Sequence, residues 1–487
     1  MKVCIVGGGS SGWMAASTFS QLIEYDQLTL IESPNAPISG VGESTLEKIR
    51  DWIHLVGIDE SEMIRETNGS LKQSIKFTNF LKKDSGSFHY PFGNQPTFNS
   101  ETWWGHLDHN KSYSPNDYAQ YINPLALVAE SGKVDTSSPL AFHFDAIKFG
   151  TYLKNNYCED IKHIVADVVD CEKNDGGIKY LKLDNGDVVE ADLFIDCTGF
   201  KSLLLGEYLE EPFIPYDHLI PNDSAWAAKV PYNNKERELV AYTECTAIDN
   251  GWVWNIPLWE RIGTGYVYSS KHVSDEDAKQ EFIEHLHSKG FNTSECEFKK
   301  ISMRIGRHER TFVKNVVAIG LSAGFIEPLE SNGLFTTHEN LIDLYKTLRR
   351  GKPSQFMKDL YNTSTSLSFD EFADFVAVHY AFTQREDTQY WRDNFNRSYD
   401  LIGVDNYDRY GLKAFSRELY KFSTFDKPAK GFHYIASGMN VCAYTEPKVS
   451  SYNLFQMESV QSDWKERIDN LPTVLQVLED VHKESQK

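Results

Sequence analysis

The chain has 487 residues, of which 41% are hydrophobic and 24% charged, a composition typical of a globular protein large enough for two substantial modules. Its formal net charge of −21 repels phosphate backbones and anionic membrane surfaces, so we expect neither a nucleic-acid nor a membrane partner. No apolar run approaches the roughly 18 residues that a membrane span needs, and the N-terminal KVCIV is too short for the core of a signal peptide. We therefore expect a cytoplasmic protein.

The seven cysteines are scattered along the chain, odd in number and without a CxxC pair. This pattern fits neither a disulfide framework nor a zinc site, so we predict no metal ion. We expect most of the thiols to be buried as small hydrophobic groups.

The N-terminal segment predicts a dinucleotide-binding turn. Residues 3–6 form a short apolar run, Gly7, Gly9 and Gly12 follow in GxGxxG order, and residues 13–25 are compatible with a helix. In such a strand, turn and helix, the glycines permit the tight turn, the close approach of a pyrophosphate and the packing of the helix.

Three later segments extend this module. A strand over residues 28–31 ends in Glu32, about 20 residues past the last glycine, where a carboxylate can bind a ribose hydroxyl. Residues 192–198 (DLFIDCT) and 315–319 (NVVAI) are predicted to be buried strands, and completing the first sheet from such distant segments is the layout of FAD monooxygenase-type proteins. No second GxGxxG directly follows a strand, so no dedicated nicotinamide site is evident, and we expect the reducing equivalents to come from elsewhere.

Further motifs occur in order along about four-fifths of the chain. They are GVGEST (40–45), AFHFDA (141–146), DLFIDCTGF (192–200), GWVWNIP (251–257), GYVYSS (265–270), FIEPLES (325–331) and REDTQYWR (385–392). GWVWNIP is similar to the WxWxIP signature of the flavin-dependent tryptophan-halogenase family, and GVGEST is similar to its flavin-contacting GVGEAT loop. The chain therefore resembles this family, and WxWxIP, PLES and the lysine of NGSLKQSIKF form a more specific combination than GxGxxG alone.

The resemblance implies roles for individual residues. Lys72 matches the catalytic lysine and Glu330 the glutamate near the reacting carbon, while Ser331, Asn332 and Gly333 are implied to lie beside the flavin and the halide, with Ser331 also at the substrate. Asn332 replaces the family's usual Thr, and we expect little effect because the inferred halide contact uses backbone amides. Cofactor contacts are implied for Gly7, Gly9, Ser10, Ser11, Gly12, Glu32, Gly40, Val41, Gly42, Glu43, Ser44, Gly199, Gly320 and Ile326.

The chemistry implied by the resemblance is halogenation of an aromatic carbon. In the family, FADH2 and dioxygen form a flavin hydroperoxide, a halide ion (chloride, bromide or iodide) attacks it, and the resulting hypohalous acid is relayed to the lysine. A flavin reductase that supplies FADH2 is then the expected partner. A lysine such as Lys72 can hydrogen-bond the oxidant or be halogenated by it. A carboxylate such as Glu330 can stabilise the cationic ring and assist loss of its proton.

Lys72 and Glu330 also have plainer interpretations. The local pattern places Lys72 opposite Leu71 and is equally compatible with a solvated surface lysine. Glu330 is equally compatible with a carboxylate favoured at the start of the helix that we predict over residues 334–350. For both residues, the functional interpretation rests on the resemblance.

Trp252, Trp254 and His143, which belong to the motifs, also have both a structural and a functional interpretation. Trp252 and Trp254 alternate along a strand and share one face, which is typical of core packing. In the family, this pair lies near the flavin and is thought to keep the organic substrate away from it, so we interpret the two residues as a gate. His143 of AFHFDA is interpreted as a hydrogen-bonded structural histidine.

The predicted substrate contacts depart from those of tryptophan-specific members, which often sandwich the indole between the His and the Phe of a short HxF segment. In FHYPFG, Tyr90 and Phe92 stand at the equivalent places and His89 is displaced by one. Tyr434, Tyr444 and Tyr452 are further candidate wall residues. The retained PLES glutamate favours a small free indole-like compound over a carrier-bound pyrrole or phenol.

We predict an α/β fold: an FAD-dependent monooxygenase-like, Rossmann-type flavin module (1–84 and 141–339) with an interleaved, largely helical substrate module (85–140 and 340–487). The predicted function is FADH2- and O2-dependent halogenation of a small electron-rich aromatic compound. The alternatives are a flavin-dependent monooxygenase or oxidase, which needs no lysine with a glutamate, and a noncatalytic flavin-binding protein. A homodimer is compatible with these expectations.

Overall fold

The computed structural model describes residues 1–35, 43–93, 119–120, 123–397, 431–440 and 462–483. The chain forms two discontinuous compact units: Met1–Gly69, Phe144–Asp217 and Met303–Phe372 make the first, and Ser70–His143, His218–Ser302 and Ala373–Lys487 make the second. These boundaries differ from the sequence-based division mainly because the segment His218–Ser302 belongs to the second unit.

The first unit is built on a six-stranded sheet in the order β20-β21-β12-β1-β2-β8, parallel except for the pairing of β20 with β21. Its strands are β1 (Lys2–Val6), β2 (Gln27–Glu32), β8 (Lys162–Val165), β12 (Leu193–Asp196), β20 (Phe312–Val313) and β21 (Val316–Ala318). The predicted strands are confirmed, and the segments near residues 195 and 317 complete the N-terminal sheet as expected. Continuous burial along β12 and β21 reflects a parallel sheet covered on both faces.

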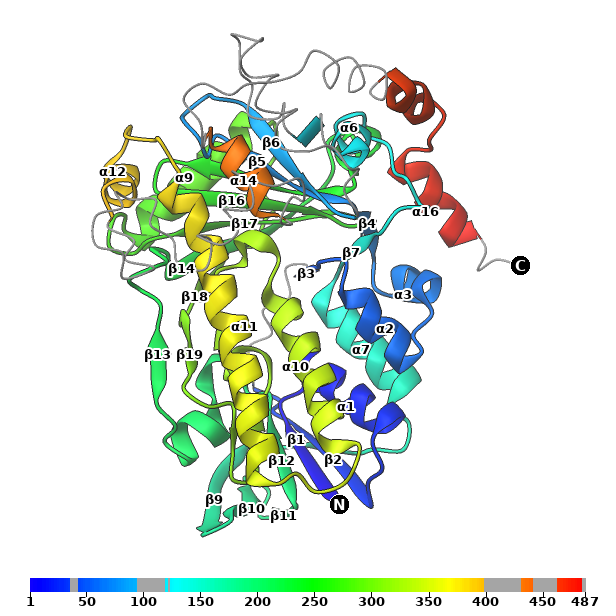
Figure 1. Ribbon diagram of the computed structural model, residues 1–487, viewed down its shortest axis with the longest axis vertical. Coiled ribbons are helices and arrows are strands. Elements are labelled where there is room, and N and C mark those ends of the chain that lie inside the picture. The colour runs from blue at the N-terminus through cyan, green and yellow to red at the C-terminus, as the bar shows by residue number, and fades with distance from the viewer. Residues whose placement is uncertain (36–42, 94–118, 121–122, 398–430, 441–461, 484–487) are drawn as a thin grey trace. The chain divides into compact units, whose positions relative to one another are not determined.

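Helices cover this sheet. Helix α1 (Ser10–Leu22) begins directly after the glycine turn and packs against β1, β2, α7 (Ala146–Tyr157) and α10 (Gly333–Leu348) (Figure 1). The side chain of Asp145 caps α7 by accepting hydrogen bonds from the amides of the second and third residues that follow it. The other helices of the unit are α2 (Ile49–Val56), α3 (Glu60–Glu66) and the first part of α11 (Gln355–Ala381).

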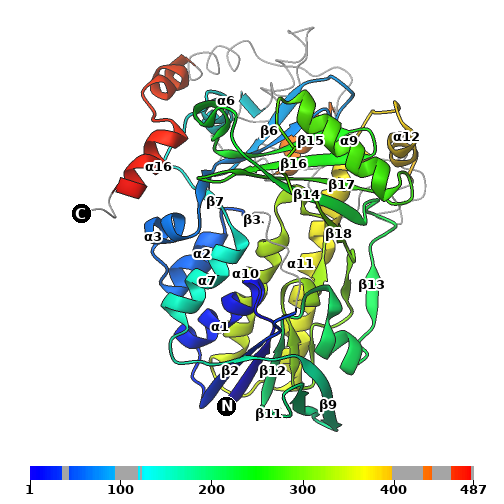
Figure 2. The same cartoon turned by 180° about the vertical axis from the view of Figure 1, so that it is seen from behind.

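The second unit contains a seven-stranded sheet in the order β18-β14-β17-β16-β15-β5-β6, antiparallel except for the β5 and β15 pair. Its strands are β5 (Ser74–Thr78), β6 (Ser87–Pro91), β14 (Ser224–Val230), β15 (Tyr242–Ile248), β16 (Gly251–Pro257), β17 (Ile262–Tyr268) and β18 (Lys299–Ser302). Helix α9 (Asp275–Ser288) lies along one face of this sheet (Figure 2), where Phe282 packs with Val253 and Tyr266.

Two short strands of the second unit, β4 (Ser70–Lys72) and β7 (Ala141–Phe144), pair antiparallel. Besides α9 and the last part of α11, its helices are α6 (Pro124–Glu130), α8 (Lys235–Glu238), α12 (Gln389–Phe395), α14 (Phe432–Gly438) and α16 (Val474–Lys483). Within the ranges given above, no helix combines the length and the apolarity needed to cross a bilayer.

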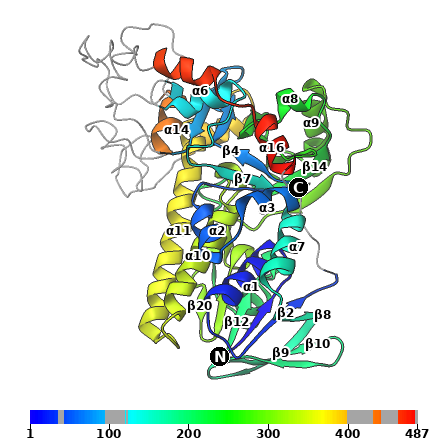
Figure 3. The same cartoon turned by 90° about the vertical axis from the view of Figure 1, so that its right-hand side faces the viewer.

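The smaller strands of the first unit complete the fold. They are β3 (Glu43–Ser44), β9 (Val168–Asn174), β10 (Gly177–Leu183), β11 (Val188–Glu190), β13 (Phe213–Pro215), β19 (Gly306–His308) and β22 (Gly324–Phe325). The sheet β9 to β11 lies next to the parallel sheet (Figure 3).

The thiols behave mainly as expected. Cys4, Cys158, Cys197 and Cys245 are buried free thiols, and desolvation raises the pKa of Cys158 to about 12. Cys442 lies outside the described residues.

Candidate active site

The glycine turn after β1 divides into packed positions and one open position. Gly7 has φ +119, and a Cβ at this residue would lie 2.1 Å from the carbonyl oxygen of Cys197. A Cβ at Gly12 would lie 1.8 Å from the carbonyl oxygen of Gly7, whereas one at Gly9 meets no protein atom within 4 Å. The protein's own packing therefore requires Gly7 and Gly12, while Gly9 borders open space at the start of α1.

This open space suits an anionic group. The first turn of α1 has no acidic residue and no side-chain cap, so its leading amides face no competing acceptor on their own helix. Such amides and the positive end of the helix dipole attract a phosphate. The residues here therefore fit the pyrophosphate of FAD.

Glu32 ends β2, as predicted. Its Oε2 lies 2.8 Å from Nε2 of His163, which fixes the carboxylate, and a carboxylate retains further acceptor capacity for a ribose hydroxyl. A Cβ at Gly8 would lie 2.4 Å from the Glu32 side chain, so the turn accommodates the carboxylate only because position 8 is glycine. The sequence pattern did not single out His163 or Gly8.

The late glycine loop lies against the N-terminal turn in the same unit. Gly320 has φ +68, and a Cβ at this residue would lie 2.2 Å from Oγ of Ser11. Ile326 is buried in the same loop, and Oγ of Ser10 donates to the carbonyl oxygen of Ala146 at 3.3 Å. The structure thus brings the predicted residues of the early and late segments together.

The predicted flavin loop is only partly described, because Gly40, Val41 and Gly42 lie outside the described residues. Ser44 is buried, and its Oγ lies 3.0 Å from Oγ of Ser331, which connects this loop to the PLESNG turn. Burial, followed by the negative charge of Asp145, raises the pKa of Glu43 to about 7.

A mid-chain turn adds a residue that the sequence analysis did not select. Gly199 has φ +70, a left-handed conformation that favours glycine. Asp196 is fully buried at the end of β12 and accepts hydrogen bonds from the amides of Thr198, Leu204 and Leu205 at 2.8–3.0 Å. Asp196 therefore shapes the turn that carries Gly199. An acidic residue inside the predicted buried strand DLFIDCT is the sequence feature that could have identified it.

Glu330 is fully buried at the end of a short 3-10 helix, Pro328–Glu330. Ser331 follows with φ 58, and this left-handed residue turns the chain into Asn332, the N-cap of α10. The predicted helix over 334–350 is confirmed as Gly333–Leu348, so Glu330 lies just before it and inside the protein.

The PLESNG turn also offers amides at a helix start. The Asn332 side chain donates to the carbonyl oxygen of Glu327 at 2.7 Å and does not cap the helix. The first amides of α10 have no intrahelical acceptor, and a Cβ at Gly333 would meet no protein atom within 4 Å. These features fit an anion held by backbone amides.

Lys72 ends β4 in the second unit and has no exposed surface. The surface interpretation of this lysine is therefore wrong. Its Nζ lies 5.2 Å from the centre of the Phe92 ring, within the range of a cation–π interaction. Because removing an ammonium group from water is costly, a fully buried lysine is rare unless its surroundings compensate the charge.

Phe92 belongs to an aromatic wall in the second unit. Tyr90 lies edge-on to Phe92, with ring centres 5.9 Å apart, and is stacked with Tyr434 at 5.8 Å. Phe375 of α11 contacts Tyr90 edge-on at 6.3 Å. Tyr90, Phe92 and Tyr434 were expected here, whereas Phe375 was missed because its helix shows no local sign of a substrate contact. Tyr444 and Tyr452 lie outside the described residues.

Trp252 and Trp254 lie on β16, as predicted, and both are buried. Their ring centres are 6.2 Å apart. Trp254 packs on Gly265 of the neighbouring strand, where a Cβ would lie 2.2 Å from the indole. The glycine of GYVYSS therefore makes room for a motif tryptophan.

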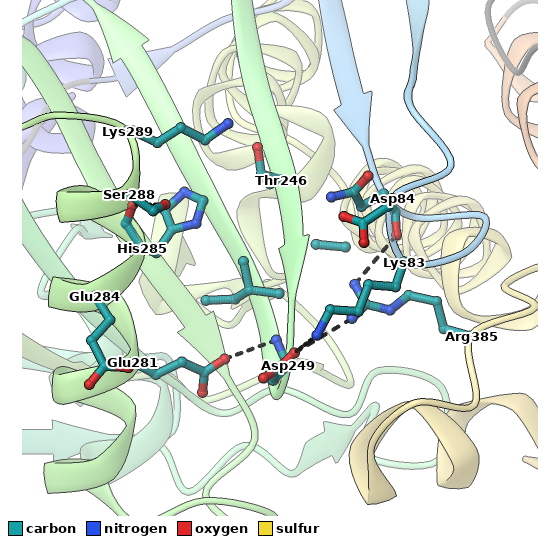
Figure 4. Close-up of a pocket in the computed structure, with 13 residues that line it drawn as sticks. Lys83, Asp84, Thr246, Asp249, Glu281, Glu284, His285, Ser288, Lys289 and Arg385 are labelled. Atoms are coloured by element: carbon teal, nitrogen blue, oxygen red, sulfur yellow. Dashed lines mark hydrogen bonds and ion pairs between the residues drawn. The ribbon is translucent and has the colours of Figure 1, made fainter.

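A cavity of about 420 Å³ on the second unit is lined by other residues (Figure 4). Its wall carries charged groups, including Lys83 paired with Asp249 at 3.3 Å, and the Glu281 carboxylate, which accepts from the Asp249 amide at 2.9 Å. Such ion-paired walls are unlike the largely apolar lining that binds a small aromatic molecule. None of the predicted site residues lines this cavity.

Comparisons with known proteins agree with the motifs. The tryptophan halogenase family model matches residues 2–401. Tryptophan 7-halogenase RebH of Lentzea aerocolonigenes is 34% identical over 419 residues, which cover 81% of this chain and 78% of that protein. The tryptophan 6-halogenase SttH of Streptomyces toxytricini superposes with a TM-score of 0.85 at 29% identity, covering 99% of both chains. BrvH, a flavin-dependent halogenase of Brevundimonas sp. BAL3, superposes with a TM-score of 0.83 at 27% identity, again covering 99% of both chains.

The family match spans most of the chain, and the similar structures share its complete fold. The motifs that carried the resemblance are also those that form the glycine turn, the PLESNG turn and the buried lysine. The chain therefore belongs to the tryptophan halogenase family of flavin-dependent enzymes.

Proposed function

We propose that the protein catalyses FADH2- and O2-dependent halogenation of a small free aromatic compound of the indole class. The burial of Lys72 against the ring of Phe92 is the observation that carries this proposal. A flavin monooxygenase or oxidase has no need of a buried lysine beside an aromatic wall, whereas delivery of an electrophilic halogen to one ring carbon does need a polar carrier there.

The first unit supplies the groups that would hold FAD. The amides around Gly9 would bind the pyrophosphate and Glu32 the ribose, and the amides of Asn332 and Gly333 would hold the halide. Bound and reduced, FAD would supply electrons that activate dioxygen, so that the dioxygen could oxidise the halide to hypohalous acid. A separate flavin reductase would provide the FADH2.

Lys72 then carries the halogen. It either hydrogen-bonds hypohalous acid or, as the free amine, attacks it so that an N–halogen bond forms, the O–halogen bond breaks, and hydroxide leaves with the amine proton as water. Aromatic attack on this halogen forms the carbon–halogen bond and breaks the N–halogen or O–halogen bond. The electron pair of the broken bond stays on nitrogen or oxygen, which takes up a proton from solvent, and the ring is left cationic. Glu330 stabilises that charge and accepts the ring proton, which restores aromaticity.

The remaining predicted residues position the substrate. Tyr90 and Phe92 would provide aromatic faces for an electron-rich ring, and Ser331 is assigned as a further substrate residue. Trp252 and Trp254 are assigned as the gate that would keep the substrate away from the flavin, as the resemblance implies.

A screen of aromatic compounds tests the function. The wild type would be incubated with FAD, NADH, a flavin reductase, one of chloride, bromide or iodide, and a panel that includes indole and free tryptophan. Mass spectrometry is expected to show a bromine isotope doublet in the bromide reactions. A product that carries oxygen and no halogen would favour the monooxygenase alternative.

Variants of two lysines make this test specific. Lys72→Ala should abolish arene halogenation while consumption of reduced flavin and oxygen continues, because oxidation of the halide does not use the lysine. Lys229→Ala is the matched control, since Lys229 is an exposed strand lysine of the same unit, and it should retain activity. If Lys72→Ala halogenates at the wild-type rate, the proposed role of Lys72 is wrong.

A further inference from the structure

The strand that carries Lys72 has a buried histidine as its neighbour. In the pairing of β4 with β7, Ser70 lies opposite His143 and Lys72 lies opposite Ala141. Because alternate residues share one face of a strand and opposed residues share it too, Ser70, Lys72 and His143 all project to the same side. All three side chains are fully buried.

Both ring nitrogens of His143 are hydrogen-bonded. Nδ1 lies 3.1 Å from Oγ of Ser70, and Nε2 lies 2.8 Å from Oγ1 of Thr243. The Ser70 hydroxyl also bonds the carbonyl oxygen of Pro257, to which only the serine can donate. The serine therefore accepts from Nδ1–H.

The imidazole of His143 is neutral, so that Nε2 accepts from the threonine hydroxyl. Burial, followed by the positive charge of Lys72, holds the pKa of His143 well below its ordinary value. The ring thus stays uncharged and keeps one donor and one acceptor. It adds no second positive charge next to the lysine.

The chain of hydrogen bonds connects two motifs that are far apart in sequence. Pro257 is the last residue of β16, the strand of Trp252 and Trp254. Thr243 belongs to β15, the strand paired with β16. His143 and Ser70 therefore link the strand of Lys72 to β16, which carries the tryptophan pair, and to the neighbouring strand β15.

The residue after Lys72 is held as well. The amide of Gln73 donates to the carbonyl oxygen of Ala241 at 2.7 Å, and the amide of Phe92 donates to the carbonyl oxygen of Gln73 at 2.8 Å. Two hydrogen-bonded residues therefore flank Lys72 along the strand: Ser70, two residues before it, and Gln73, directly after it. The ring of Phe92 is placed by the same contacts.

We propose that His143 is a positioning residue, which acts through Ser70 and Thr243 to hold the Lys72 ammonium at the aromatic wall. This inference rests on the proposed function of Lys72. When the link is broken, Lys72 should intercept less of the hypohalous acid. More of the oxidant should then escape into solution, while its production is unchanged.

A pair of substitutions at Thr243 tests the link. Thr243→Val keeps the shape of the side chain but removes the hydroxyl that bonds Nε2, and Thr243→Ser keeps the hydroxyl as the matched control. The assay uses bromide and the indole compound that the wild type brominates fastest in the screen. It measures brominated product per reduced flavin oxidised, oxygen uptake, and escaped hypobromous acid captured by a soluble 1,3-diketone.

Thr243→Val should lower product per flavin about fivefold, the effect of one lost buried hydrogen bond, with unchanged oxygen uptake and a matching rise in captured oxidant. Thr243→Ser should resemble the wild type. An unchanged ratio of brominated product to oxidised flavin in Thr243→Val would overturn the inference. An equal fall in product and oxygen uptake would also overturn it, because a purely structural role would impair oxidant production and halogen transfer together. A wild type that brominates nothing would instead refute the proposed function.

A second pair covers the case in which Thr243→Val does not fold. His143→Asn retains a donor for Ser70, whereas His143→Leu retains neither bond. Among variants with wild-type thermal unfolding and FAD affinity, the asparagine should recover part of the coupling that the leucine loses. Equal coupling in the two variants would contradict the proposal.

Discussion

Replacing Gly9 with alanine separates binding of FAD from folding of the turn. At Gly9 the backbone has φ −79 and ψ −176, an extended conformation open to alanine, and the added Cβ meets no protein atom within 4 Å. At Gly12 the same methyl group would lie 1.8 Å from the carbonyl oxygen of Gly7. The two substitutions add the same group to one turn, with different consequences.

The expected magnitudes follow from these contacts. Gly12→Ala forces the start of α1 away from the turn, an overpacking that costs about 1–3 kcal/mol of stability or more. Gly9→Ala should change the free energy of unfolding by no more than about 1 kcal/mol. Its methyl group enters the space proposed for the pyrophosphate and should break one hydrogen bond from a backbone amide to the phosphate. Loss of one such hydrogen bond to a charged group costs about 1.5–3 kcal/mol, or roughly 10- to 100-fold in the dissociation constant of FAD.

Titration of each apoprotein with FAD, followed by flavin fluorescence or calorimetry, measures the affinity. Thermal unfolding without FAD measures the stability. Gly9→Ala is expected to have wild-type stability and weakened FAD binding, and Gly12→Ala to be impaired in both. Wild-type affinity in Gly9→Ala would show that the pyrophosphate does not bind at this turn.

Three other predictions concern the reductant, the ring proton and the pH. The purified protein with NADH and FAD alone should be inactive and should gain activity when a flavin reductase or chemically reduced FAD is added; efficient NADH oxidation without a reductase would contradict this. Glu330→Gln keeps the shape and removes the charge, so product formation should fall about 10²-fold while oxygen uptake continues, and an unchanged rate would exclude the proton-accepting role. The pKa of Glu43 is raised from 4.5 to about 7 in the folded protein, so the protonated carboxyl stabilises the folded apoprotein. This contribution is about 3 kcal/mol, is fully present below pH 4.5, and is lost as the pH rises through 7. Denaturant unfolding of Glu43→Gln should lack this decline, and parallel pH curves for variant and wild type would refute the assignment.

The local sequence was sufficient for the parallel sheet and its glycine turn. Short apolar runs predicted β1, β2, β12 and β21, since a strand covered on both faces is mostly apolar. The glycine spacing predicted a turn in which Gly7 and Gly12 are sterically required. The end of α10 near residue 348 was readable from its basic residues and the following glycine.

The sequence could not decide the surroundings of the functional side chains. The burial of Lys72 was undecided because β4 is too short to show a hydrophobic pattern, and its cover comes from residues such as Phe92 that lie elsewhere in the chain. The same limit applied to Phe375, which contacts Tyr90 from a helix that begins more than two hundred residues later. Contacts between distant segments leave no local periodicity.

His143 shows the division between sequence and tertiary structure in one residue. Its motif was sufficient to predict a hydrogen-bonded structural histidine, because a histidine between apolar residues of a strand is buried and needs partners. The identity of those partners, Ser70 and Thr243, depended on the pairing of β4 with β7 and on the position of β15. The sequence alone therefore determined the residue types, the main strands of the parallel sheet and the family of this protein. Tertiary structure alone decided which polar groups are removed from water together, and that removal gives Lys72 and Glu330 surroundings different from those of surface residues.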